Sequence, residues 1–205
     1  MKLVVFLVYG LLLLVTSLGT GNKRYAKKAI NTSLLIMFLL SVFKDGSQIP
    51  DFQVYKDSYD LSVNGGSILS MEISFYLISR LFGFFDFAGF HLVLAFYSAI
   101  FLYSFRKILL KYDSIAPSAI LIFYSNAFLV FGLIQIRAGA AIGLVYLIIH
   151  SLKGKYKRFF TWIFAIFIHT SSAIFIPLDI LCKRVFTKRV ILILVLLSII
   201  VIPLI

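Results

Sequence analysis

The chain has 205 residues, of which 61% are hydrophobic and 14% are charged, and its mean hydropathy is +1.04. Soluble globular domains are about 45–50% apolar and about 25% charged, so this composition excludes an ordinary soluble domain and predicts an all-α, polytopic membrane protein. The net charge of +12 lies in short clusters between apolar runs, which indicates cytoplasmic loops and contact with membrane lipids rather than with nucleic acid.

The first apolar run, Leu3–Leu18, follows Lys2 as in a signal peptide, but no A-x-A cleavage site follows it. Four basic residues come soon after the run, namely Lys23, Arg24, Lys27 and Lys28. This stop-transfer pattern predicts a retained helix with its N-terminus outside. Ala29–Phe43 is expected to return as a second span, although it is shorter than the roughly 20 residues of a full crossing.

The stretch from Lys44 to Glu72 is the longest polar segment. It holds five of the eight acidic residues, namely Asp45, Asp51, Asp57, Asp60 and Glu72. Pro50 and the pair Gly65-Gly66 are typical of a loop. The aromatic residues between the acids favour an ordered loop over a linker. We therefore predict one ordered outer loop over about residues 44–72.

The next apolar segments are expected to alternate across the membrane. Ile73–Phe85 is short and carries Arg80, which predicts an interfacial or re-entrant helix. The alternative is a tilted helix whose Arg80 pairs inside the bundle. Ala88–Phe105 is predicted to run inward, which places the following basic residues in the cytoplasm, namely Arg106, Lys107 and Lys111.

Arg137 lies between two apolar runs, Pro117–Ile134 and Ala138–Leu152, which are predicted to run outward and back. An arginine near a bilayer costs several kcal/mol unless it is paired or faces water, so Arg137 is a candidate functional residue. The alternative is a turn residue that snorkels to the interface. The scheme places the next basic residues inside, namely Lys153, Lys155, Lys157 and Arg158.

The next apolar segment, Phe159–Leu181, is interrupted by the polar residues His169–Ser172. A single crossing would place the basic residues after it outside, so we favour a helical hairpin broken at His169. Val190–Ile205 begins another span and stops at Ile205. We expect either a truncated form or a short last helix.

Three polar groups are expected to meet at the outer face: the acidic loop, Gln135 with Arg137, and His169. The guanidinium fork of Arg137 matches a pyrophosphate, and Asp51 or Glu72 is suited to act as a general base. The alternatives are solvated loop charges for the acids and a hydrogen-bonded core residue for His169. A single histidine here and a single cysteine in the chain, Cys182, predict neither a metal site nor a cofactor.

Four segments carry a resemblance to a known family, in the order KDGSQIPDFQVY, MEISFYLISRLF, QIRAGAAIGL and FIHTSSAIFIPL. Together they cover about residues 43–178 and resemble the EpsG family, a Wzy-type group of polysaccharide polymerases. The matching positions are Lys44, Gly46, Asp51, Phe52, Tyr55, Glu72, Tyr76, Gln135, Arg137, Ala141, His169 and Pro177.

The resemblance implies a multi-pass glycosyltransferase of the bacterial cytoplasmic membrane. Such an enzyme transfers a growing glycan from undecaprenyl pyrophosphate to a hydroxyl of an incoming lipid-linked repeat unit, and so builds capsule, O-antigen or exopolysaccharide. It implies that Arg137 stabilises the departing pyrophosphate, that Asp51 or Glu72 activates the hydroxyl, and that His169 orients phosphate or acceptor. Substrate contacts are expected from Gln135, Lys44, Tyr55 and Tyr76.

Two other functions remain open at this point. A flippase or transporter subunit would bind the same lipid-linked sugar through Arg137 without needing a carboxylate base. A non-catalytic membrane partner, such as a truncated family member, would tolerate the loss of Arg137. A chain-length regulator and flippase proteins are candidate partners of the polymerase.

Overall fold

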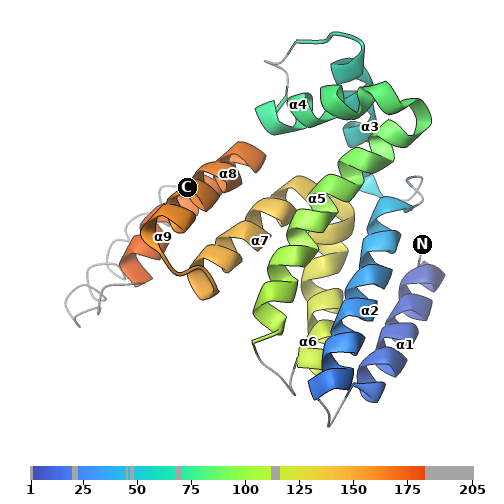
Figure 1. Ribbon diagram of the computed structural model, residues 1–205. Helices are drawn as coiled ribbons and strands as arrows, with labels where there is room; N and C mark the ends of the chain where they lie inside the picture. Colours follow the sequence, from blue (N-terminus) through green and yellow to red (C-terminus); the bar gives the residue numbers. More distant parts are fainter. Residues whose placement is uncertain are drawn as a thin grey trace, which may run out of the picture. The chain divides into compact units, whose positions relative to one another are not determined.

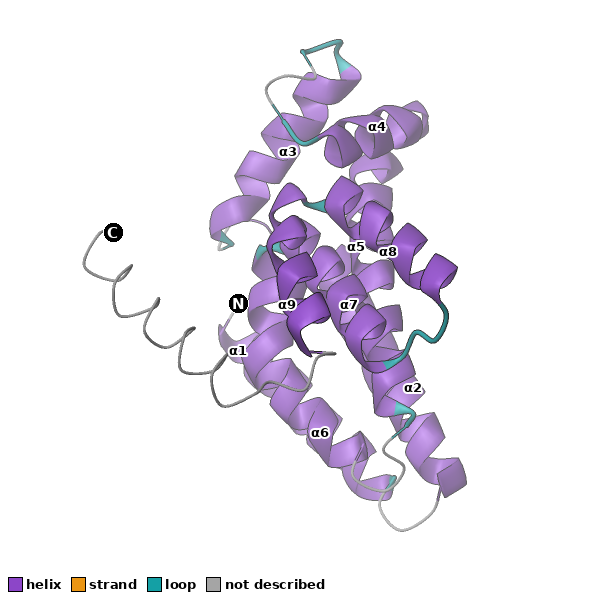
Figure 2. Ribbon diagram, turned by 90° about the vertical axis from the view of Figure 1, so that its left-hand side faces the viewer, coloured by secondary structure: helices purple, strands orange, loops and turns teal. Residues whose placement is uncertain are grey.

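The computed structural model describes residues 2–19, 23–44, 46, 49–67, 71–111 and 116–182, and every regular element in these ranges is helical (Figures 1 and 2). The predicted all-α class is therefore confirmed for the described part of the chain. The chain divides into two compact units, residues 1–172 and 173–205. The expectation of one transmembrane domain over 1–205 stays a prediction, and the expected last span lies outside the described residues.

One core of the first unit lies among several apolar helical segments. They are α1 (Lys2–Leu18), α2 (Lys23–Val42), the second half of α5 (Asp86–Leu109), α6 (Ala116–Phe123) and the π-helix that continues α6. The buried side chains at its centre include Leu12, Met37, Phe101 and Ile120. The basic cluster that we placed in a loop before the second span lies in the first turns of α2, because the helix begins at Lys23.

Helix α1 exposes an apolar stripe along its length. The large side chains on it follow helical spacing and are at least 62% exposed, namely Leu3, Phe6, Leu7, Leu14 and Leu18. Soluble proteins rarely expose a continuous apolar surface of this kind, whereas a lipid bilayer would cover it. Within the described part of the chain, two helical segments are long and apolar enough to cross a membrane by length and composition, Arg24–Val42 and Ala88–Leu109.

The predicted run Pro117–Ile134 is not one regular helix, because α6 passes into a π-helix, η5 (Tyr124–Ile134). The side chains of Ser125 and Asn126 both donate hydrogen bonds to the carbonyl of Ile122, at 3.2 and 3.0 Å. In an α-helix this carbonyl accepts the backbone N–H of Asn126. The polar side chains compete for it, which favours the wider turn at this point.

The prediction of an ordered loop over residues 44–72 is wrong for its middle part, which forms helix α3 (Pro50–Val63). Proline suits the first helical position, Asp51 lies in the first turn, and Gly65 after the helix has a φ of 88°. The aromatic residues that we assigned to an ordered loop have helical spacing, and Tyr55 and Tyr59 bury one face of α3.

The short helix predicted over Ile73–Phe85 is observed as α4 (Ile73–Phe82) followed by a 3-10 turn, η3 (Gly83–Phe85). Helices α3 and α4 lie together near the start of α5 (Figure 1). Arg80 on α4 is exposed and donates a long hydrogen bond of 3.4 Å to the carbonyl of Ser62. Its interfacial position remains a prediction.

Helix α7 (Ile136–His150) packs closely on α5, and α8 (Lys155–Ile168) follows it. A Cβ atom at Gly143 would lie 3.2 Å from both the Cα of Phe101 and the Cβ of Ser104, so glycine allows the close approach of the two helices. The predicted break at His169 is confirmed, since α8 ends at Ile168 and a 3-10 turn, η6 (Thr170–Ile174), follows. In the second unit, α9 covers Phe175–Cys182 and contains Pro177.

The basic clusters of the first unit lie at one end, which we name the basic end. Arg106 at the end of α5 donates to Asn31 near the start of α2, at 2.8 Å. Lys111 donates to the last carbonyl of α7, that of His150, at 2.5 Å. Arg158 at the start of α8 bonds the carbonyl of Ile148 at 2.6 Å. Helices α3 and α4 therefore lie at the opposite end, with the starts of α5 and α7.

We expect Gly143→Leu to destabilise the fold by roughly 1–3 kcal/mol, because the new side chain meets the backbone of α5. The matched control is Gly10→Leu on α1, where a Cβ atom would meet no other atom within 4 Å. Thermal unfolding in detergent micelles should show a lower apparent Tm for Gly143→Leu alone. Equal Tm values for the two variants would contradict the close packing of α5 on α7.

Candidate functional site

The start of α4 gathers three charged or titratable side chains from distant parts of the sequence. Glu72, the residue before α4, places Oε1 at 2.5 Å from Nδ1 of His169 and Oε2 at 3.3 Å from an Nη of Arg137. Of the groups that were expected to meet at the outer face, the structure brings together Glu72, Arg137 and His169, but the side chain of Gln135 is exposed and does not join them. We name these three residues the charged cluster.

Arg137 occupies an electrostatically unfavourable position for a cation. It is the second residue of α7, and the N-terminus of a helix carries a partial positive charge. The carboxylate of Glu72 compensates this charge, and two aromatic rings accept the guanidinium. The Cζ atom of Arg137 lies 5.1 Å from the ring centre of Tyr55 and 5.2 Å from that of Phe75. We name this arrangement the arginine cage.

The ion pair of Glu72 and Arg137 is close but not aligned as a hydrogen bond. Neither Oε2 of Glu72 nor Nε of Arg137 has a hydrogen-bond partner, although both atoms are buried. Buried polar atoms without partners are uncommon and costly in folded proteins. The two side chains are 20% and 24% exposed, so the site is enclosed without being sealed. An anion could bond Nε without displacing a hydrogen bond that the arginine already makes.

The hydrogen bond to Glu72 determines the state of His169. A carboxylate accepts a hydrogen bond, so Nδ1 of His169 carries the proton that it donates to Oε1. In the neutral ring, Nε2 is then an acceptor that can take a proton from a substrate hydroxyl. This arrangement of a carboxylate that holds a histidine ring is the one that activates histidine bases in hydrolases.

The backbone beside His169 is fixed by α4. The hydroxyl of Ser74 donates to the carbonyl of Ile168 at 3.0 Å and lies 3.1 Å from the hydroxyl of Tyr97. Phe75 is fully buried and stacks on Tyr97 with ring centres 6.2 Å apart. Glu72 therefore binds His169, and Ser74 binds the carbonyl of the residue before it. Phe75 packs on the guanidinium of Arg137.

The end of η5 positions Arg137 from the other side. Ser41 donates to the carbonyl of Gly132 at 2.7 Å and lies 2.6 Å from the hydroxyl of Ser98. The ammonium of Lys44 donates to the carbonyl of Leu133. Ser41 and Lys44 thus donate hydrogen bonds to two carbonyls near the end of the π-helix. The positive charge of Lys44 also interacts favourably with the negative end of the helix dipole. Two residues further on, the carbonyl of Gln135 accepts the N–H of Gly139 at 2.8 Å and starts α7.

Besides Tyr55, four predicted site residues lie outside the charged cluster. Lys44 is buried on the carbonyl of Leu133, and Gln135 exposes its side chain. Asp51 lies in the first turn of α3, where its charge acts on Lys44 and Tyr55. The ring of Tyr76 lies 6.0 Å from the guanidinium of Arg80. Their expected roles in catalysis and binding stay predictions.

Tyr55 is the predicted binding residue that lies directly against the charged cluster. Burial raises the pKa of its hydroxyl above the usual value, and the charge of Arg137 opposes this rise. The phenol therefore remains protonated at neutral pH and presents its ring to the arginine. Among the residues that the structure describes, no three His, Cys, Asp or Glu side chains gather as metal ligands.

Sequence reasoning missed the residues that hold the charged cluster in place. They are Ser41, Ser74, Phe75 and Tyr97, with Ser98 behind Ser41. The sequence does contain a serine within each of the apolar helices α2, α4 and α5. Such a serine indicates a contact with another segment, because a buried hydroxyl needs a hydrogen-bond partner. The sequence alone does not say which partner each one takes, because these contacts join α2 to η5 and α4 to α5 and α8.

Comparison with known proteins identified a family. The model of the EpsG family matches residues 27–205, which is most of the chain and includes all three residues of the charged cluster. No curated protein and no solved structure matched the chain.

We expect Glu72 and Arg137 to couple by roughly 1–2 kcal/mol in a double-mutant cycle of Glu72→Gln and Arg137→Gln, because the pair is mostly buried. The control cycle uses Gln53 and Asp57, an exposed pair four residues apart on α3 whose side chains lie 2.7 Å apart. This pair should couple by about 0.5 kcal/mol or less. Unfolding with SDS measures both cycles, and a charged pair no stronger than the control would contradict the proposed compensation.

Burial lowers the pKa of Lys44 from about 10.5 to about 8, against the charge of Asp51, which raises it. Between these values the folded state binds fewer protons than the unfolded state, so this residue makes stability rise with pH through that window. We expect the apparent Tm to gain more between pH 7 and about pH 9.5 in the parent than in Lys44→Met. The same gain in both proteins would show that Lys44 titrates normally.

Proposed function

This chain belongs to the EpsG family, whose members are of the polysaccharide polymerase type, and we propose that it polymerises lipid-linked sugar repeat units itself. Family membership establishes a membrane-associated role in polysaccharide biosynthesis. The reaction, its donor and the residues that carry it are our proposal. The observation that supports it best is the arginine cage, where a cation is held at a helix N-terminus beside a carboxylate–histidine pair.

The first step of the proposed reaction is binding of the donor pyrophosphate. Nε of Arg137 is buried without a hydrogen-bond partner, and the guanidinium fork matches two phosphate oxygens. The N-terminus of α7 adds backbone N–H groups and a favourable dipole for an anion. An ion pair with Glu72 alone does not explain the unpaired Nε atom, because the two partners of a simple ion pair would align their polar atoms in hydrogen bonds. These features support an anionic substrate group at Arg137.

The second step is attack by a hydroxyl of the incoming repeat unit on the anomeric carbon of the donor sugar. The bond from this carbon to the pyrophosphate oxygen breaks, and a bond to the acceptor oxygen forms. Nε2 of His169 takes the hydroxyl proton while Glu72 holds the ring and stabilises the imidazolium. Arg137 stabilises the negative charge that develops on the leaving undecaprenyl pyrophosphate.

This assignment gives Glu72 a different part from Asp51. The carboxylate of Glu72 already bonds His169, so the two residues act together as the proton acceptor. Asp51 instead influences Lys44 and Tyr55. Of the two acids considered from the sequence, the contacts favour Glu72.

We propose that the protein lies in the bacterial cytoplasmic membrane and crosses it several times. The charged cluster then lies on the outer side of this membrane. Support comes from the exposed apolar stripe of α1 and from the separation of the basic end from α3 and α4. A chain-length regulator and flippase proteins are the expected partners. The glycan substrate arrives on undecaprenyl pyrophosphate and needs no nucleotide sugar.

The test is complementation of a bacterial host that lacks its own polymerase and makes the matching repeat unit. The parent should restore a ladder of long surface glycans. Arg137→Lys should reduce long-chain product by about 10²–10³-fold, because an ammonium cannot replace the fork that stabilises the leaving group. Arg80→Lys is the matched control and should leave the ladder unchanged, since Arg80 is exposed on the same side of the fold.

Variants of the carboxylate–histidine pair test the proposed proton acceptor. Glu72→Gln and His169→Asn should both reduce the ladder to single repeat units. If both variants keep the ladder, Glu72 and His169 are not the proton acceptor, and if Arg137→Lys keeps it as well, the proposed site is wrong. If the parent itself yields only single repeat units, the polymerase proposal fails and a flippase subunit or a non-catalytic partner is favoured.

A further inference from the structure

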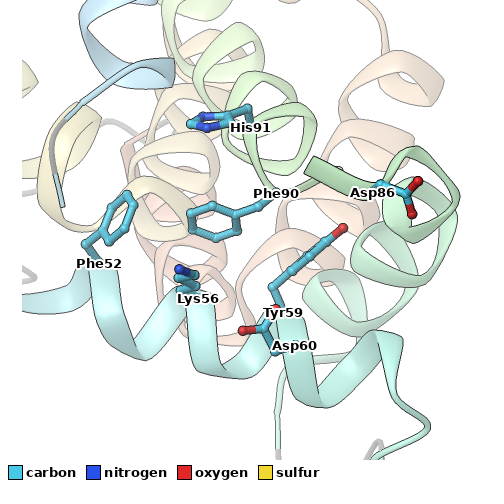
Figure 3. Close-up of a pocket in the computed structure, with 7 residues that line it drawn as sticks. All are labelled: Phe52, Lys56, Tyr59, Asp60, Asp86, Phe90 and His91. Carbon is cyan, nitrogen blue, oxygen red and sulfur yellow. The ribbon is translucent and has the colours of Figure 1, made fainter. Parts of the chain in front are cut away.

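A recess lies between α3 and the start of α5, and none of the charged cluster lines it (Figure 3). Its volume is about 580 Å³, which is within the range of about 300–1,000 Å³ for small-molecule sites. We name it the α3–α5 hollow.

Three aromatic rings form the apolar wall of the hollow. Phe90 lies between Phe52 and Tyr59 in Figure 3, with ring centres 5.3 and 5.5 Å away. Phe90 and Tyr59 are buried, whereas Phe52 is partly exposed and offers its ring to a ligand. The Phe52 and Phe90 rings meet edge to face at 90°, so they form a wall with a corner rather than a flat stack.

Charged groups surround this wall. Asp60 on α3 and Asp86 at the start of α5 both line the hollow, with Lys56 between the aromatic residues of α3. Burial, followed by the charges of Asp60 and Asp86, raises the pKa of Tyr59. The phenol therefore stays protonated and able to donate a hydrogen bond.

Two residues of the hollow have features that fix their position. Asp86 has a φ of 41°, in the region that favours glycine, and strained backbone positions of this kind cluster at active sites and ligand sites. His91 lies 2.9 Å from the carbonyl of Val42 through Nδ1. A carbonyl only accepts, so Nδ1 carries the proton and Nε2 of the neutral ring is an acceptor.

We propose that the α3–α5 hollow binds a neutral pyranose ring of the glycan substrate. A pyranose has an apolar face of C–H groups that packs on aromatic rings such as that of Phe52. Its hydroxyls both donate and accept, and so they match carboxylates, a lysine and a histidine placed around one wall. The two carboxylates outnumber Lys56 and disfavour an anionic sugar such as a uronic acid.

This inference deepens the proposed function and rests on it for the source of the sugar. Helix α3 connects the two sites, because Tyr55 contributes to the arginine cage while Phe52, Tyr59 and Asp60 line the hollow. Tyr55, Tyr59, Phe75 and Phe90 belong to one buried cluster. A sugar in the hollow would therefore be held by the same rigid group of side chains that positions Arg137.

Saturation-transfer NMR on the full chain in lipid nanodiscs tests the hollow directly. The probes are the methyl glycosides of glucose, galactose and N-acetylglucosamine, with methyl glucuronide as the anionic counterpart. We expect transfer from at least one neutral glycoside and much weaker transfer from the glucuronide. Asp60→Asn should weaken binding by about tenfold, the loss expected when a hydrogen bond to a charged group is removed.

The control for Asp60→Asn is Asp57→Asn, one helical turn away on α3, where the carboxylate bonds Gln53 and does not line the hollow. Phe52→Leu keeps an apolar side chain and should also weaken binding. Unchanged binding in Asp60→Asn, equal loss in Asp57→Asn, preference for the glucuronide, or no transfer from any neutral glycoside would each overturn the proposal.

Arg137→Lys separates this proposal from that of the polymerase. The variant should bind the neutral glycosides as the parent does, even though its glycan ladder is lost. Binding that disappears in Arg137→Lys and persists in Phe52→Leu would place the sugar at the charged cluster and not in the hollow. If the parent binds glycosides but restores no ladder, the proposal of a sugar site in the hollow stands and the proposal of polymerisation is refuted.

Discussion

The site depends on keeping a guanidinium at the positive end of a helix. Arg137 would be repelled by the dipole of α7 if it stood alone, and it is too far from bulk water to be fully hydrated. Glu72 supplies the opposite charge, and Tyr55 and Phe75 supply ring faces. Each of these partners comes from α3 or from the start of α4. The contacts with Arg137 and the burial of their own aromatic residues together connect α3 and α4 to the rest of the first unit.

The rest of the first unit acts as a rigid support for that arrangement. Ser41 and Lys44 fix the end of the π-helix, and Gly143 lets α7 lie close against α5. Helix α5 joins both cores, since its first half packs with α3 and α4, its second half packs with α2 and α6, and α7 packs along it. A lipid-facing protein gains little from hydrophobic association of its helices, so close packing and buried hydroxyl contacts are the interactions that remain available.

Sequence patterns were sufficient for the residues that chemistry makes conspicuous. An arginine and a histidine in apolar surroundings and an acid before an apolar helix were identified, and the structure places all three together. The spacing of Tyr55 and Tyr59 was typical of a helix, but Pro50, Gly65 and the acidic residues led us to predict a loop instead of α3. The π-helix and the serine contacts could not be predicted, because they depend on which carbonyls remain unsatisfied once distant helices meet.

The separation of charge between the two ends has an energetic consequence for orientation. In a bilayer, inverting the first unit would carry the basic clusters of α2, α5 and α8 across the membrane potential. Each elementary charge contributes about 2.3 kcal/mol per 100 mV, and each Lys or Arg near anionic headgroups contributes about 1 kcal/mol. The summed cost over three clusters exceeds the stability of a typical domain. One orientation would therefore be populated almost completely, and the charged cluster and the α3–α5 hollow would be accessible from a single compartment.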